Sequence, residues 1–323
     1  MNGLATDGRI PVTLLTGWLG AGKTTLLNRI LSQPEGRKFA VLVNEFGEIG
    51  IDDRLVVRSD EEIVELRNGC ICCSVRGDLV ASLVKLHQSR ARRWFGRRRF
   101  DHVLLETTGI AEPAPLLKTF LVEAQIAALF QMVSVLCLID ARTAAQVLSE
   151  STAEEQVAVA DLLLLNKIDL VESEDLELLS ARLRKINPSA ELKPTLHADL
   201  STAEVLAHRP PRIPAADQLS NHHHHEGFQA VSLTEDRPLD AMQTRLWLGA
   251  CVRVLGARLI RYKGFLHLQG QPNRVVLQGV YDLFEANAGE PWGTDHPKTE
   301  LVFIGRNLDR DFLRRGLDAC VVA

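Results

Sequence analysis

A glycine-rich segment near the start of the chain has the residue types and the spacing that bind a chain of phosphates. Residues 17–24 read GWLGAGKT, which fits the pattern G-x-x-x-x-G-K-[ST] between an apolar run and a helical pattern. Glycines let backbone N–H groups close around phosphate oxygens, a lysine adds positive charge there, and a hydroxyl can bind Mg²⁺. The nucleotide contacts expected from this loop are Gly17, Gly20, Ala21, Gly22, Lys23, Thr24 and Thr25.

A second motif indicates which base the nucleotide carries. Asn166-Lys167-Ile168-Asp169 directly follows the apolar run Leu162–Leu165. A carboxylate at the fourth position can accept hydrogen bonds from N1–H and the exocyclic amine of guanine, and adenine lacks that pair of donors. The motif therefore favours GTP and disfavours a kinase that uses ATP. The contacts expected at the base are Asn166, Lys167 and Asp169, with His197 in a second loop, Leu196-His197-Ala198.

Between these two motifs, the run His102–Leu105 ends in Glu106-Thr107-Thr108-Gly109. An acidic residue at this strand end is expected to hold Mg²⁺ or its water, and the glycine can contact the γ-phosphate. We therefore expect Lys23, Thr24, Glu106 and Gly109 to form the catalytic set, with Thr24 and Glu106 on Mg²⁺. Ile110 occupies the position at which many GTPases carry a glutamine that orients water, so hydrolysis without a partner or metal should be slow.

Three cysteines lie close together in the segment Gly69-Cys70-Ile71-Cys72-Cys73. Thiolates bind Zn²⁺ and other soft or borderline ions, and a nearby carboxylate can supply a further ligand. The C-x-C-C spacing is tight for a zinc-finger scaffold, so it favours an exchangeable metal site over a permanent structural one. A thiol redox switch is the alternative. Cys137, Cys251 and Cys320 lie in apolar or amphipathic patterns and are expected to be small buried hydrophobes.

The elements that must position these residues alternate in type along the first two thirds of the chain. Short apolar runs typical of buried strands alternate with amphipathic stretches typical of helices, which predicts an α/β fold with a mostly parallel sheet. The predicted strands are 12–15, 39–43, 63–66, 102–105, 133–139 and 162–165, and the predicted helices are 24–32, 78–87, 113–120 and 175–186.

A change in composition separates this region from the rest. We predict a phosphate-loop domain over residues 1–207, a linker rich in proline and histidine over 208–226, and a smaller α+β domain over 227–323. The last domain is expected to have a helix at 239–251, strands at 257–268, 274–281, 283–287 and 300–304, and a closing helix at 309–317. The linker contains His222–His225, which is either a weak auxiliary metal site or a plain polar segment.

The composition of the chain bears on whether it binds nucleic acid or a membrane. The chain has 323 residues, 46% of them hydrophobic, and a net charge of −4. This balance gives no indication of nucleic-acid binding, and the sequence predicts neither a secretory leader nor a membrane-spanning segment. We therefore expect a cytoplasmic protein with no nucleic-acid or membrane partner.

Together these motifs resemble the CobW-like family of metallochaperone GTPases, which includes proteins of cobalamin biosynthesis, nitrile hydratase activation and zinc transfer. The resemblance spans nearly the whole chain. It is carried by TGWLGAGKTTLLN, NEFGEIGIDD, NGCICCSVRGDL, LLETTGIAEP and NKID, and in the second domain by RYKGFLHL, Pro291-Trp292-Gly293 and the segment 299–305.

The resemblance implies that the bound metal is zinc or cobalt, held by Cys70, Cys72 and Cys73, with Glu48 as a possible partner ligand. It also implies that GTP binding and metal binding are coupled, and that hydrolysis delivers the metal to a client protein that requires it. A homodimer is possible. Some relatives carry an acidic residue where this chain has Val43, so that position has no ligand role here.

Two other functions remain open at this point. One is a metal sensor whose nucleotide site only reports its state. The other is an assembly factor for one cobalt-dependent pathway, such as cobalamin synthesis or nitrile hydratase maturation. Slow hydrolysis with strong stimulation by one metal or client would favour a chaperone, and no hydrolysis with any metal would favour a sensor.

Overall fold

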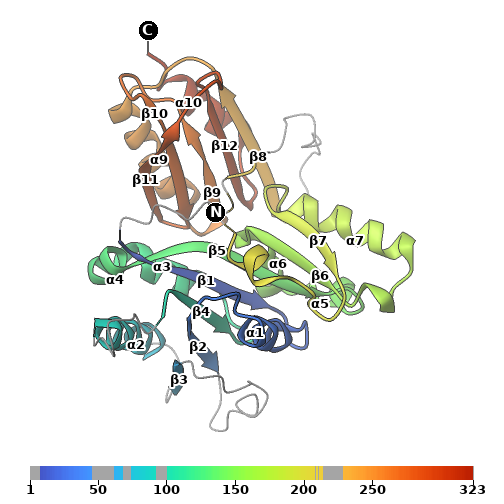
Figure 1. Ribbon diagram of the computed structural model, residues 1–323. Coiled ribbons are helices and arrows are strands. Elements are labelled where there is room, and N and C mark those ends of the chain that lie inside the picture. The colour runs from blue at the N-terminus through green and yellow to red at the C-terminus, as the bar shows by residue number, and fades with distance from the viewer. Residues whose placement is uncertain are drawn as a thin grey trace. The chain divides into compact units, whose positions relative to one another are not determined.

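The computed structural model describes residues 8–45, 62–67, 74–91, 100–207, 209, 211–213 and 228–322. The chain divides into two compact units (Figure 1). One consists of Met1–Ser180 and Leu192–Arg209, and the other consists of Ala181–Glu191 and Pro210–Ala323. The predicted linker, including His222–His225, lies almost entirely outside the described residues.

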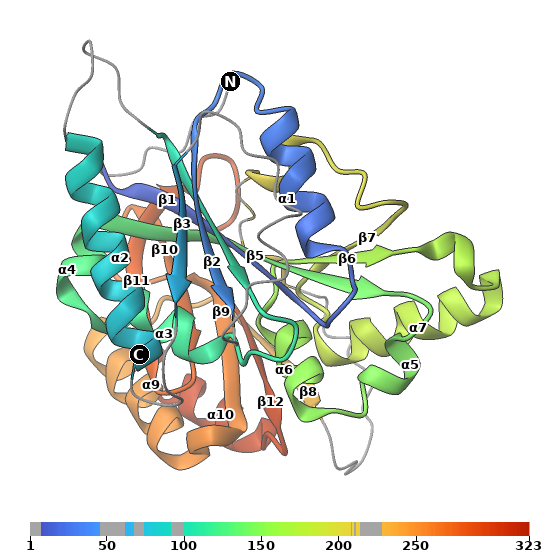
Figure 2. The ribbon, with the colours of Figure 1, turned by 90° about the horizontal axis from the view of Figure 1, so that it is seen from below.

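The first unit is built on a seven-stranded sheet with the order β3-β2-β4-β1-β5-β6-β7 (Figure 2). Neighbouring strands from β3 to β6 pair in parallel, and β7 extends the sheet beyond β6. The carboxyl ends of these parallel strands therefore meet at one edge, where ligands bind in folds of this kind. The strands are β1 (Ile10–Gly17), β2 (Phe39–Glu45), β3 (Glu62–Arg67), β4 (His102–Thr107), β5 (Phe130–Asp140), β6 (Leu162–Asn166) and β7 (Glu191–Thr195).

The strands at the middle of this sheet are apolar throughout because both of their faces are covered. Every residue of β4 and of β6 is buried. On one face, Leu26, Leu27 and Ile30 of the first helix pack against strand residues such as Leu104 and Leu136. This arrangement confirms the predicted α/β fold with a mostly parallel sheet.

The helices that alternate with the strands of the seven-stranded sheet include all those predicted and several that were not. All four predicted helices are present within a few residues of their expected ends, but α4, α5, α6 and α8 were not predicted. Helices α4, α5 and α8 have only 6, 4 and 4 residues, and so short a segment carries too few turns for a clear helical period. The helices are α1 (Lys23–Ser32), α2 (Ser74–Ala91), α3 (Ala114–Val122), α4 (Ala124–Leu129), α5 (Ala144–Val147), α6 (Ser151–Val159), α7 (Ser173–Ile186) and α8 (Thr202–Val205).

The second unit has a five-stranded antiparallel sheet with the order β11-β10-β9-β12-β8. Trp247, Leu313 and Leu317 from two helices pack into one core with sheet residues that include Tyr262 and Phe303. This confirms the predicted α+β domain. Its elements are β8 (Phe228–Glu235), α9 (Ala241–Leu255), β9 (Leu259–Leu266), β10 (Asn273–Val280), β11 (Leu283–Pro291), β12 (Thr299–Arg306) and α10 (Arg310–Asp318).

Strand β8 was missed by the sequence analysis, which placed only four strands in this domain. It follows the polar linker closely and pairs with β12 along its whole length, from Phe228 opposite Arg306 to Glu235 opposite Thr299. The alternation of apolar and polar residues in β8 is short. The strand forms because it pairs with the distant β12, and the local sequence pattern alone does not indicate it.

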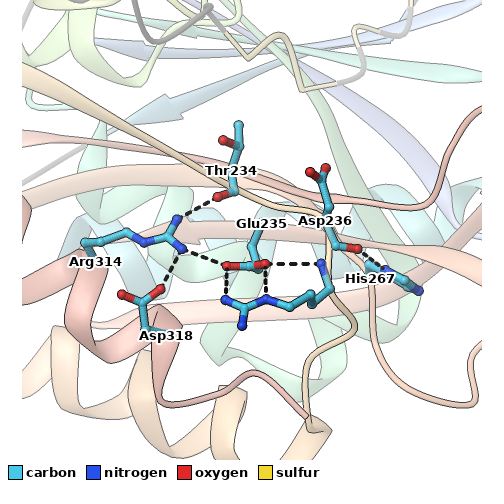
Figure 3. A network of polar contacts seen from close by, with 7 residues as sticks. Thr234, Glu235, Asp236, His267, Arg314 and Asp318 are labelled. Carbon is cyan, nitrogen blue, oxygen red and sulfur yellow. Dashed lines mark hydrogen bonds and ion pairs between the residues drawn. The ribbon is translucent and has the colours of Figure 1, made fainter. Parts of the chain in front are cut away.

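A buried carboxylate fixes the end of β8 to α10 (Figure 3). Glu235 accepts hydrogen bonds from Arg237 Nε at 2.8 Å and Nη2 at 3.0 Å, and from Arg314 Nη2 at 2.7 Å. Arg314 also donates to the Thr234 carbonyl at 2.7 Å and pairs with Asp318. The hydrogen bonds from Arg237, with those from Arg314, lower the pKa of Glu235 to about 2.

Within the described ranges, no helix is both long enough and apolar enough to cross a membrane.

Candidate functional site

The phosphate loop connects the end of β1 to the start of α1, as its sequence predicts. Gly22 precedes the helix in a left-handed conformation (φ 110°), and a Cβ there would lie 2.6 Å from Asn166 Nδ2. Only glycine fits this position without moving a neighbour. In the part of the chain that the structure describes, no side chain caps the N-terminus of α1. Its first N–H groups therefore suit an anion, which supports a phosphate ligand here.

Lys23 adds a buried cation to the same loop. Its Nζ donates to the carbonyl of Gly17 at 2.8 Å and to that of Trp18 at 3.1 Å, and the residue is only 7% exposed. The ammonium group is thus held at the turn where phosphates would lie. A buried charge in a loop of backbone amides is well suited to a negatively charged ligand.

Thr24 and Glu106 bring two oxygen ligands together. Leu15 of β1 pairs with Glu106 of β4, which places the carboxylate beside the start of α1. The Thr24 hydroxyl donates to Glu106 Oε1 at 3.3 Å, and Glu106 is 6% exposed. A hydroxyl and a carboxylate next to a phosphate site fit the oxygen preference of Mg²⁺.

Asn166 connects the two loops predicted to contact the base with the phosphate loop. Its Nδ2 donates to the Ala21 carbonyl at 2.9 Å, and its Oδ1 accepts from the Ala198 N–H at 2.9 Å. Asn166 is 2% exposed, so both of these bonds are shielded from water. The structure therefore brings residues 21, 166 and 198 together at the carboxyl edge of the sheet.

The other residues predicted at the base lie at the same edge. Lys167 has a left-handed backbone (φ 60°), and its Nζ pairs with Asp140 Oδ2 at 2.7 Å. Asp169 lies in the 3₁₀ turn Ile168–Leu170 and is exposed. His197 is exposed as well and also has a left-handed backbone (φ 51°). Both exposed side chains are thus accessible to a ligand.

Asp140 was missed by the sequence analysis. It is the last residue of β5, opposite Asn166 in the pairing of β5 with β6, and its Oδ1 also accepts from the Arg142 N–H at 3.0 Å. The available signal was a charged residue that directly ends a buried apolar run, at the edge where the other motifs end.

The predicted metal ligands Cys70, Cys72, Cys73 and Glu48 lie outside the described residues. The structure describes the elements on either side, with β3 ending at Arg67 and α2 beginning at Ser74. Elsewhere in the described chain, no group of three or more histidine, cysteine or acidic residues could hold a metal ion.

The remaining three cysteines behave as predicted. Cys137, Cys251 and Cys320 are all free and buried. Burial raises the pKa of the Cys137 thiol to about 12, and the same cause raises the pKa of Cys251 to about 12. These groups stay protonated near neutral pH, so they are poor metal ligands.

A groove of about 570 Å³ lies in the second unit and contains none of the predicted site residues. It is lined by aromatic and charged side chains, with Arg274 held by Asp295 at 3.0 Å and stacked 5.0 Å from the Trp292 ring. A buried positive charge, two oxygen ligands and backbone donors instead come together at the phosphate loop. The phosphate loop is therefore the candidate site.

Comparisons with known proteins agree with this geometry. Residues 11–194 match the CobW/HypB/UreG nucleotide-binding domain, and residues 228–321 match the cobalamin synthesis protein CobW C-terminal domain. The chain is 34% identical to the zinc chaperone YjiA of Escherichia coli, over 94% of this chain and 96% of the relative. It is 31% identical to the zinc chaperone CobW of Pseudomonas aeruginosa, over 95% of this chain and 90% of the relative.

A solved structure extends this likeness to the fold. The crystal structure of zinc-bound YjiA GTPase from E. coli superposes with a TM-score of 0.71 and 30% identity, over 97% of this chain and 99% of that one. Both the nucleotide-binding domain and the C-terminal domain are matched in sequence. The chain therefore belongs to the CobW/HypB/UreG family of nucleotide-binding proteins.

Proposed function

We propose that this protein is a GTP hydrolase that binds zinc and delivers it to proteins that require the metal. One observation carries the proposal: a phosphate loop, a Thr24–Glu106 oxygen pair and an Asn166 link between the loops converge in a domain whose sequence also contains C-x-C-C. Relatives that match nearly the full length of this chain are named zinc chaperones, which favours zinc as the cargo. Cobalt is the next choice.

In this proposal, the phosphate loop binds the GTP phosphates through residues 17–25. Lys23 would leave its present carbonyl partners and pair with the β- and γ-phosphates, while Gly109 would donate its N–H to the γ-phosphate. Mg²⁺, held by Thr24 and Glu106, would supply charge stabilisation for the leaving phosphate oxygens. These residues position and stabilise charge, which is most of what phosphoryl transfer requires from a protein.

Specificity for guanine would come from Asp169 and its neighbours. The exposed carboxylate of Asp169 can accept from both guanine donors, and Lys167, held by Asp140, would lie along the nucleotide. The loop that contains His197 would close the other side of the base. Asn166 supports the phosphate loop and the loop that contains His197, because it bonds to the backbone of each.

Hydrolysis by the protein alone should be slow. Ile110 is 61% exposed beside the expected γ-phosphate contact and has no group that can orient water. A client protein, the bound metal or a second copy of the chain would then supply the missing group. A dependence of hydrolysis on these groups suits a metal carrier, because GTP would be hydrolysed only when the metal or its acceptor is present.

Coupling to the metal would follow from the position of Cys70, Cys72 and Cys73 between β3 and α2. Segments on both sides of these cysteines connect to the sheet whose carboxyl edge carries the phosphate loop. Ordering those segments on a γ-phosphate would change the geometry of the thiolates and of Glu48. Zinc and GTP would then affect each other's affinity by the same factor.

The test is a single round of hydrolysis by the zinc-loaded protein in the presence of a competing zinc chelator. We expect zinc transfer to the chelator to accelerate as GTP becomes GDP, and to stay slow with a GTP analogue that cannot be hydrolysed. Equal transfer rates with GTP, the analogue and GDP would contradict the proposal.

A further inference from the structure

A buried glutamine reaches the loop that follows β4. Gln156 lies in α6 and is 1% exposed. Its Nε2 donates to the carbonyl of Gly109 at 3.1 Å and to the carbonyl of Ala111 at 3.1 Å. Both hydrogens of one side-chain amide are therefore used on a single short loop.

These two bonds fix the shape of the loop around Ile110. The carbonyls that Gln156 binds belong to the residues on either side of Ile110, and the N–H of Ala111 closes a turn on the Thr108 carbonyl at 3.2 Å. With both flanking carbonyls turned inward, the Ile110 side chain is 61% exposed. The backbone carbonyls of Thr108, Gly109 and Ala111 are therefore all paired, which holds the backbone of this loop in place.

The same bonds hold the loop against the phosphate loop. A Cβ added to Gly109 would lie 2.4 Å from the backbone nitrogen of Leu19, so the two backbones are in direct contact. Gln156 also lines a cavity of about 20 Å³ together with Trp18 and Asp140. Because the two backbones touch, any shift of the Gly109 loop would change the distance between that loop and the phosphate loop by about the size of the shift.

Helix α6 connects this contact to the base site. It ends at Val159, and the chain then enters β6, which ends at Asn166. Gln156 thus links the loop beside the γ-phosphate position to the strand that carries the base motif.

We propose that Gln156 is a positioning residue that holds the Gly109 N–H at the γ-phosphate position and so sets the preference for GTP over GDP. The inference rests on the proposed function, because it needs a nucleotide whose γ-phosphate Gly109 contacts. Gln156 does not touch the nucleotide itself. A neutral amide suits this role, since it donates two hydrogen bonds without introducing a buried charge.

The test compares Gln156→Met with Val159→Ala. Methionine has a similar length and is apolar, so it removes both hydrogen bonds and leaves the volume largely filled. Val159 is fully buried in the same helix and bonds to neither loop through its side chain, so Val159→Ala provides a matched loss of packing. For each protein we would measure the thermal midpoint, kcat and KM for GTP, and the Kd for GDP and for a GTP analogue.

We expect Gln156→Met to bind GDP within about twofold of the unmodified protein, to bind the GTP analogue about tenfold more weakly and to lose about tenfold or more in kcat. Val159→Ala should lower the thermal midpoint and leave the ratio of the two affinities unchanged. Equal weakening of both nucleotides in Gln156→Met, or no weakening, would overturn the inference alone. An unmodified protein that binds no guanine nucleotide would overturn the proposed function and this inference with it.

Discussion

The side-chain amide of Asn166 donates to the backbone carbonyl of Ala21 across a separation of 145 residues, at a distance of 2.9 Å. Through its oxygen, the same side chain accepts from the N–H of Ala198. The phosphate loop and both base loops therefore share one buried support. This arrangement distinguishes Asn166, on which any nucleotide would depend, from Gln156, on which only the γ-phosphate would depend.

Replacing Asn166 with alanine should weaken GTP and GDP alike. Two buried backbone groups would lose their partners, at a cost of about 1–3 kcal/mol each, so we expect the affinity for both nucleotides to fall by tenfold or more. Isothermal titration with each nucleotide measures this. Loss of GTP binding with GDP binding intact would contradict the role of Asn166 as a support shared by the phosphate loop and the base loops.

Replacing Asp169 with asparagine should change the base that is bound. The loss of two charge-assisted hydrogen bonds, each about 1.5–3 kcal/mol, should weaken GTP by a hundredfold or more. An asparagine amide can instead donate to the second carbonyl of xanthine, so XTP should bind better than GTP. Because Asp169 is exposed, the thermal midpoint should not change. If the variant keeps the same preference for GTP over XTP in competition titrations, Asp169 does not contact the base.

Replacing Ile110 with glutamine should accelerate hydrolysis in the absence of metal and partners. The side chain is 61% exposed, so the change costs little stability and places a carboxamide beside the expected γ-phosphate contact. We expect kcat to rise about tenfold, which is about 1.4 kcal/mol of barrier. Ile110→Ala is the control and should leave the rate low. If both variants hydrolyse GTP at the same rate as the unmodified protein, another step limits turnover.

Replacing Glu235 with glutamine should destabilise the second domain at neutral pH and much less in acid. Its pKa is lowered to about 2 in the folded chain, so its charged pairs stabilise the fold above the ordinary carboxylate pKa and are lost as pH falls through about 2. We expect a loss of about 1–3 kcal/mol at pH 7. Hydrogen exchange at the amides of β8 and α10 would measure it at pH 7 and pH 3.

The neighbouring Asp236 gives a matched control for that experiment. Its carboxylate is exposed, and Figure 3 shows no contact of its side chain with the other residues drawn. Asp236→Asn should change stability by less than about 0.5 kcal/mol at either pH. A loss as large as that of Glu235→Gln would mean that net charge, rather than the Arg237 and Arg314 bonds, stabilises this corner.

Local patterns predicted the parts of the fold that depend on local physics. The run Leu162–Leu165 indicated a buried strand, and the motif after it had to lie at the edge where parallel strands end. The phosphate loop was predictable for the same reason, because its glycines and lysine are adjacent in sequence. The structure places these motifs together in the order that the sequence implied.

Contacts made across long sequence distances could not be predicted in this way. Nothing around Gln156 indicates that its amide reaches a loop 47 residues earlier, and Asp140 gains its lysine partner only when β5 and β6 pair. Strand β8 was missed for a related reason, since its partner β12 lies far along the chain. The cysteine segment remains a prediction from sequence because it lies outside the described residues.

The central claim is that GTP and zinc binding are coupled through the segment that carries Cys72 and Cys73. Its most direct test is the zinc Kd of the protein with a GTP analogue, with GDP and without nucleotide, repeated on Cys72→Ala and Cys73→Ala. We expect zinc affinity to differ by at least about fivefold between the analogue and GDP forms, and both variants to lose that zinc binding. A zinc Kd that is the same in all three nucleotide states would contradict the account.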